Sequence, residues 1–109
     1  MRSFMSGALV VAMTLGAAGA ARAADDKVAK AKAVFSAQKC SMCHAVEGAG
    51  NKNRPLDGVG STLTPEEIKK WIVSPKEQKA DTKMKAYPSL PAEDLDALVT
   101  WLSSLKKKE

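Results

Sequence analysis

Every cysteine and histidine of this chain lies within five residues, Cys40-Ser41-Met42-Cys43-His44. Two thiols three positions apart can each add across one vinyl group of a haem, and the adjacent imidazole is then close enough to ligate the iron from one face. The spacing therefore predicts one covalently bound haem c, attached through Cys40 and Cys43, with His44 on the iron. The ring would give every other segment an apolar surface to pack on, which constrains the fold more than any other feature.

Three other uses of these residues fit the sequence less well. A redox-active C-x-x-C dithiol belongs in a strand-helix-strand context, and the chain shows no such pattern. A zinc site needs four ligands, one more than two cysteines and one histidine supply. A disulfide between Cys40 and Cys43 would close a very small loop and so would stabilise the fold little.

The N-terminus has the pattern of a secretory signal. Arg2 precedes an apolar run over residues 8–18, and Ala21-Arg22-Ala23 supplies the small-x-small pattern of a signal-peptidase site. We expect cleavage after Ala23, or one residue later, which divides the chain into a signal peptide (1–23) and an exported domain (24–109). An uncleaved membrane anchor over residues 4–21 is the alternative, but its many Gly and Ala residues make it weakly hydrophobic. The expected location is the periplasm, without stable membrane insertion after cleavage.

Composition narrows the possible partners. The formal net charge of +5 falls to +3 when Arg2 and Arg22 leave with the signal. Haem propionates would nearly cancel the remainder, so electrostatic steering must depend on where the lysines lie. Nucleic-acid binding needs a basic face with aromatic platforms, and export together with only five aromatic residues argues against it.

The 86 residues that follow the signal make one small domain, which we expect to be a monomer. A domain of this size is only marginally stable unless something staples it together. Covalent haem would be that staple, so we expect the apoprotein to be poorly folded.

Hydrophobic periodicity predicts three helices and no strand. The first covers residues 25–38, and the last covers residues 91–105. The middle helix, residues 65–73, begins with Thr64 as N-cap, Pro65 at the first helical position and Glu67 completing a capping box. Glycine, proline and polar residues mark 48–60 and 75–91 as turns and loops.

Elimination identifies a second axial ligand opposite His44. The chain has no other histidine, and Met1, Met5 and Met13 leave with the signal. Met42 is tied between the attachment cysteines and cannot cross the ring, so only Met84 remains. A thioether paired with histidine raises the reduction potential of haem iron.

Two alternatives to the Met84 assignment stay open. A methionine in a loop often only fills a gap in the core. Lys83 and Lys85 flank Met84 and are the main rival ligands.

The exported domain resembles the class I c-type cytochromes, specifically the small bacterial monohaem kind, over nearly its whole length. The features that follow the family's order are Phe35 ahead of the C-x-x-C-H motif, Pro55-Leu56-x-Gly58 in a glycine-rich loop, Trp71 on a short helix, the methionine loop, and a closing helix with Leu98 and Trp101. The C-x-x-C-H motif is highly specific, whereas the other features are individually weak. The resemblance implies an all-α small cytochrome c fold, with N- and C-terminal helices crossing, a short middle helix, and long loops wrapped round one haem.

The same resemblance implies roles for further residues. The backbone carbonyl of Pro55 would accept a hydrogen bond from the His44 ring nitrogen that faces away from iron. The Trp71 indole would donate to a haem propionate. A plain turn proline and a plain core tryptophan are the alternatives. The crossing helices would bring together Ala31, Phe35, Leu98, Trp101 and Leu102.

An iron with both axial positions filled cannot bind a substrate, so its remaining chemistry is the gain or loss of one electron. We therefore expect a one-electron carrier that is not an enzyme. Its partners would be periplasmic redox proteins: a donor dehydrogenase or reductase and an acceptor oxidase or reductase, met in transient contacts guided by lysines such as Lys39, Lys52, Lys83 and Lys85. Two alternatives are a haem-based ligand-binding or sensor protein in which Met84 is absent from iron or displaceable, and a dedicated electron-accepting subunit of a periplasmic dehydrogenase.

Overall fold

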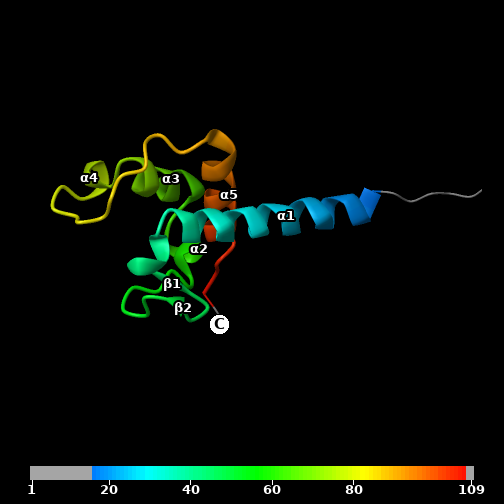
Figure 1. Cartoon of the computed structure of the whole chain (residues 1–109), viewed down its shortest axis with the longest axis horizontal. Coiled ribbons are helices and arrows are strands. Elements are labelled where there is room, and N and C mark those ends of the chain that lie inside the picture. Colours follow the sequence, from blue (N-terminus) through cyan, green and yellow to red (C-terminus); the bar gives the residue numbers. More distant parts are fainter. Residues whose placement is uncertain (1–15, 108–109) are drawn as a thin grey trace, which may run out of the picture.

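The structure, a computed structural model, is mostly helical and describes residues 16–107, with side chains described from residue 22 onward (Figure 1). Most of the predicted signal peptide lies outside the described residues. The elements in chain order are α1 (Gly16–Ala37), a 3-10 turn η1 (Cys40–Met42), β1 (Ala45–Val46), β2 (Ala49–Gly50), α2 (Val59–Thr62), α3 (Pro65–Val73), α4 (Pro75–Gln78) and α5 (Ala92–Ser103). None of the described helices is long and apolar enough to span a bilayer.

The three predicted helices form, with one shifted boundary. Helix α1 begins at Gly16 instead of residue 25. The segment ahead of the acidic pair Asp25 and Asp26 is rich in alanine, the best helix former, so the helix continues through it. All three predicted helices are present, as α1, α3 and α5, which confirms the expected helical fold class.

The expectation of no strand was wrong at one place. Strands β1 and β2 pair antiparallel, with Ala45 opposite Gly50 and Val46 opposite Ala49. Each has two residues, which is too short to show alternation in the sequence. Helices α2 and α4, which were not predicted either, have only four residues each; α2 begins inside the predicted loop 48–60, and α4 lies inside the predicted loop 75–91.

The core lies where α1 and α5 cross, as Figure 1 shows. The rings of Phe35 and Trp101 meet edge to face, with centroids 5.6 Å apart and planes at 85°. Ala31 is fully buried and Leu98 is 2% exposed, and both belong with Leu102 to the same hydrophobic cluster. The predicted contact between the first and last helices is therefore confirmed.

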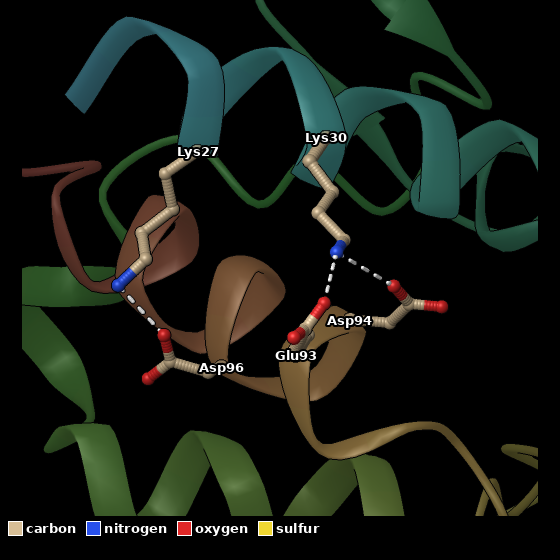
Figure 2. A network of polar contacts seen from close by, with 5 residues as sticks. All are labelled: Lys27, Lys30, Glu93, Asp94 and Asp96. Carbon is tan, nitrogen blue, oxygen red and sulfur yellow. Dashed lines mark hydrogen bonds and ion pairs between the residues drawn. The ribbon is translucent and has the colours of Figure 1, made fainter. Parts of the chain in front are cut away.

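Ion pairs fasten one edge of this crossing (Figure 2). Lys27 lies 2.6 Å from Asp96, and Lys30 lies 3.0 Å from Glu93 and 3.5 Å from Asp94. The lysines are three positions apart and so share one face of α1. The hydrogen bond that Lys30 donates to Glu93 raises the pKa of Lys30. Because these groups are largely exposed, the pairs orient the helices more than they stabilise them.

Helix α3 starts with the predicted capping box. The Glu67 amide donates to Thr64 Oγ1 at 3.2 Å, and the Thr64 amide donates to Glu67 Oε1 at 3.1 Å. The hydrogen bond that the Thr64 amide donates to the carboxylate lowers the pKa of Glu67. The cap fixes the start of α3, and Ile68 and Ile72 then face the core while Trp71 is half-buried.

The C-terminal segment closes over α2. The Gly60 amide donates to the Leu105 carbonyl at 2.8 Å, and Lys106 Nζ donates to the Gly60 carbonyl at 2.7 Å. The approach is so close that a Cβ at Gly60 would overlap the carbonyl oxygen of Ser103. This contact positions α2 beside α5.

Candidate functional site

A cavity of about 310 Å³ opens between the helices, the loop after β2 and the segment that follows α4. Its apolar lining consists of Phe35, Leu56, Val59, Leu63, Ile68, Ile72, Leu90, Leu98 and Leu102, and its other lining residues are Gln38, Cys40, His44, Arg54, Trp71, Lys79, Thr82, Met84 and Tyr87. Four of the six predicted site residues therefore line one space: Cys40, His44, Trp71 and Met84. Cys43 and Pro55 are exposed and do not line it.

Residues 38–44, which we call the attachment segment, form a tight reversal at the end of α1. Lys39 adopts a left-handed conformation (φ 62°), and the chain then enters the 3-10 turn η1. The amides of Cys43 and His44 both donate to the Cys40 carbonyl, at 3.1 and 2.9 Å. The turn points Cys40 and His44 at the cavity and leaves Cys43 at its outer side.

The two thiols differ in environment. Both cysteines are free; Cys40 is partly buried and Cys43 is exposed. Burial raises the pKa of the Cys40 thiol. Because the thiolate is the reactive form of cysteine, Cys40 is held in its less reactive form in this folded state.

A backbone carbonyl orients the His44 ring. His44 Nδ1 lies 3.2 Å from the Arg54 carbonyl oxygen. A carbonyl oxygen can only accept, so this contact places the ring proton on Nδ1 and leaves the Nε2 lone pair free for a metal. The imidazole is thus prepared as a ligand by a main-chain group.

The acceptor in this structure lies one residue before Pro55, whose carbonyl the resemblance implied for this contact. Pro55 forms an isolated parallel bridge with Ala45. In it, the Ala45 amide donates to the Arg54 carbonyl at 3.2 Å, and the Leu56 amide donates to the Ala45 carbonyl at 2.7 Å. Successive carbonyls of extended chain point to opposite sides, so the Arg54 oxygen faces His44 while that of Pro55 points away.

Sequence reasoning missed Asn51, which donates three hydrogen bonds to carbonyls of the attachment segment. Its amide donates to the carbonyls of Ser41 and His44, at 3.0 and 3.1 Å, and its side-chain Nδ2 donates to the Met42 carbonyl at 3.1 Å. An asparagine in a glycine-rich loop is a signal for local backbone bonding, but it does not say which carbonyls will be near.

Met84 lines the cavity from the segment between α4 and α5, far along the chain from His44. Its amide donates to Thr82 Oγ1 at 3.3 Å. The rival ligands Lys83 and Lys85 are exposed and do not line the cavity. The Lys85 ammonium instead lies over the Tyr87 ring, 5.5 Å from its centroid. Of these three neighbours, Met84 alone lines the cavity.

The lining suits a haem. Its walls are apolar, as a porphyrin face requires, and it combines an imidazole with a free Nε2, a thioether and a thiol. Arg54 and Lys79 add positive charge of the kind that propionates need. Imidazole and thioether groups are among the axial ligands that haem iron takes in proteins, so the donor atoms of this lining fit the group.

Comparison with known proteins agrees with this site. The sequence profile of the family described as Cytochrome c matches residues 28–106. The chain is also 34% identical over 85 residues to cytochrome c oxidase subunit 2 of Alkalihalophilus pseudofirmus; the match covers 70% of this chain and 25% of that protein. The chain thus spans about a quarter of the length of that relative. Because the family match covers residues 28–106, which include the C-x-x-C-H motif and every residue that lines the cavity, the chain belongs to the cytochrome c family.

Proposed function

We propose that this c-type cytochrome is a periplasmic carrier of one electron, with a single haem c held by Cys40 and Cys43 and ligated by His44 and Met84. Membership of the family implies covalently bound haem c and haem-based electron transfer. The observation that best supports the ligand set is that His44, with its Nε2 free, and Met84 line the same apolar cavity from segments far apart in sequence.

Each residue would contribute a distinct physical effect. The Arg54 carbonyl fixes the His44 ring and increases its basicity. The Met84 thioether is a soft donor that favours ferrous iron and raises the potential. The apolar walls exclude water from the iron, and Trp71, at the cavity wall, would donate its indole N–H to a propionate. Bound haem supplies the one-electron couple itself.

The proposed setting is the periplasm, with residues 1–23 removed as a signal and residues 24–109 acting as a monomer. The relative found by comparison is named as a subunit of cytochrome c oxidase. A terminal oxidase is accordingly our first choice of electron acceptor, with a dehydrogenase or reductase as donor. Exposed lysines beside Met84, namely Lys76, Lys83 and Lys85, would steer brief encounters with acidic surfaces.

Replacing Met84 by alanine in the haem-loaded protein tests this function. We expect loss of the long-wavelength ferric band given by methionine sulfur and binding of carbon monoxide to the ferrous iron. The potential should fall by on the order of 0.1 V or more, since axial ligands set haem potentials over roughly 0.8 V. Met42→Ala is the matched control, because Met42 is 67% exposed and lies outside the cavity lining.

An unchanged spectrum and potential in Met84→Ala would contradict the ligand assignment. Carbon monoxide binding by the unmodified protein would instead favour the ligand-binding or sensor function, in which Met84 is displaceable. A spectrum that changes only in Lys83→Ala or Lys85→Ala would identify lysine as the ligand.

A further inference from the structure

Few polar contacts hold the methionine segment, which we define as residues 80–90. No residue of this segment is buried. Within residues 16–107, its hydrogen bonds to other elements both come from Tyr87: the amide donates to the Ile72 carbonyl at 2.9 Å, and the phenol donates to the Gln38 carbonyl at 2.8 Å. The remaining bonds are local, from Thr82 to Lys79 and from Met84 to Thr82. Tyr87 is therefore the polar anchor of the segment.

The far end of the Tyr87 phenol contact is the haem-attachment segment. Gln38 directly follows α1 and precedes Cys40 by two residues. Tyr87, Gln38 and Cys40 all line the cavity. Burial, together with the nearby thiols of Cys40 and Cys43, raises the pKa of Tyr87, which agrees with this close placement. A single hydroxyl thus joins the segment carrying Met84 to the segment carrying the thiols.

We propose that Tyr87 is a positioning residue that ties the methionine segment to the attachment segment and so keeps Met84 opposite His44. The inference rests on the proposed ligation by Met84. A segment with few buried contacts opens more readily than the core, and a hydrogen bond across its base opposes that opening. Without the phenol contact, Met84 leaves the iron more often, and an added ligand that needs the open state binds with higher apparent affinity.

Binding of imidazole to the ferric, haem-loaded protein tests this role, with Tyr87→Phe as the variant. Phenylalanine keeps the ring under Lys85 and the backbone bond to Ile72, and it removes only the hydroxyl. The loss of the long-wavelength ferric band reports displacement of methionine. We expect imidazole to bind about fivefold more tightly to the variant, which is the effect of one typical hydrogen bond.

Ser61→Ala is the matched control. Ser61 Oγ accepts a hydrogen bond from the Lys107 amide at 2.8 Å, the same length as the Tyr87 phenol bond. Ser61 does not line the cavity. This variant loses a comparable bond elsewhere, so a general loss of stability would raise imidazole affinity equally in both variants, whereas a positioning role raises it only in Tyr87→Phe.

A second probe needs no change of sequence. Tyr87 is the only tyrosine of the chain, so growth on 3-fluorotyrosine labels this position alone. The more acidic phenol donates a stronger hydrogen bond in slightly acidic solution, where it stays protonated. Imidazole should then bind more weakly than to the unlabelled protein, the opposite direction to Tyr87→Phe.

The outcomes separate the two proposals. Opposite shifts with the two probes, and none in Ser61→Ala, support the positioning role. A methionine band with imidazole affinity unchanged in Tyr87→Phe, or changed equally in Ser61→Ala, overturns the positioning role and leaves the ligand assignment intact. Absence of that band from the unmodified protein overturns both.

Discussion

The crossing of α1 and α5 and the methionine segment are two sides of one small molecule, and they are held in different ways. The crossing buries Ala31, Leu98 and the Phe35–Trp101 ring pair and adds ion pairs at its edge. The methionine segment has no buried residue, and Tyr87 anchors it. Packing therefore holds the fold on one side, while on the other a few polar contacts would set the position of the proposed ligand Met84, so stability and redox behaviour should respond to different substitutions.

The largest loss of stability should come from preventing haem attachment, because both the helix crossing and the methionine segment would pack against the haem. Replacing Cys40 and Cys43 by alanine prevents covalent attachment of haem. We expect the cooperative unfolding transition to disappear in circular dichroism, because a small domain with an open apolar cavity buries too little apolar surface to be more than marginally stable. Ser41→Ala keeps both thiols and should retain haem on a denaturing gel. A double variant that still melted cooperatively would show that the crossing folds alone.

Two tryptophans sharpen the comparison. Trp101→Ala should lower the free energy of unfolding by about 3–5 kcal/mol, because it empties the centre of the crossing. The ferric spectrum of the folded fraction should not change. Trp71→Ala, at the cavity wall, should cost less stability and shift the reduction potential instead. Similar stability losses and similar reduction potentials in the two variants would contradict the proposal that the crossing sets stability and the cavity side sets redox behaviour.

A smaller effect is expected where the C-terminal segment covers α2. Gly60→Ala forces its new Cβ against the Ser103 carbonyl, and overpacking of this kind costs about 1–3 kcal/mol. Chemical denaturation with iron absorbance as the readout measures it. Thr62→Ala is the control, since Thr62 lies in the same short helix and is exposed. Equal stability of Gly60→Ala and the parent protein would show that this contact is loose.

The smallest effect concerns the ion pairs of Figure 2. Lys30→Ala should lower the melting temperature slightly, and added salt should remove the difference. The hydrogen bond that Lys30 donates to Glu93 raises the pKa of Lys30, so the stabilisation from this pair is present below the ordinary lysine pKa and is lost as pH rises through the raised value. Lys32→Ala should show neither dependence, because Lys32 makes no ion pair within residues 16–107. A large, salt-independent loss would mean that Lys30 acts through packing.

The sequence was most informative where local chemistry decides the structure. Thr64, Pro65 and Glu67 form the capping box that their spacing predicts, because all its partners lie within one turn. The apolar stripes likewise predicted α1 and α5, and the resemblance to the class I c-type cytochromes implied which of their residues meet. Strands β1 and β2 and the four-residue helices were missed, since elements of that length leave no measurable period.

The site was harder to predict because it depends on contacts between distant segments. Residue types identified His44 and Met84 as candidate ligands, and both line the cavity. No spacing rule shows that the His44 acceptor belongs to residue 54, because the Ala45–Pro55 bridge determines which carbonyl turns inward. The role of Tyr87 was missed for a similar reason, since its partner Gln38 lies 49 positions away.

The contact between His44 and the Arg54 carbonyl has a consequence for how this protein can diverge. The acceptor belongs to the main chain, so every amino acid at position 54 offers the same oxygen. Point substitutions there can accumulate without disturbing the imidazole, and selection on residue 54 should concern only its side chain. An insertion or deletion between His44 and Pro55 is different. It would bring the carbonyl of another residue to the imidazole, or none, and so change the orientation of the ring in a single mutational step.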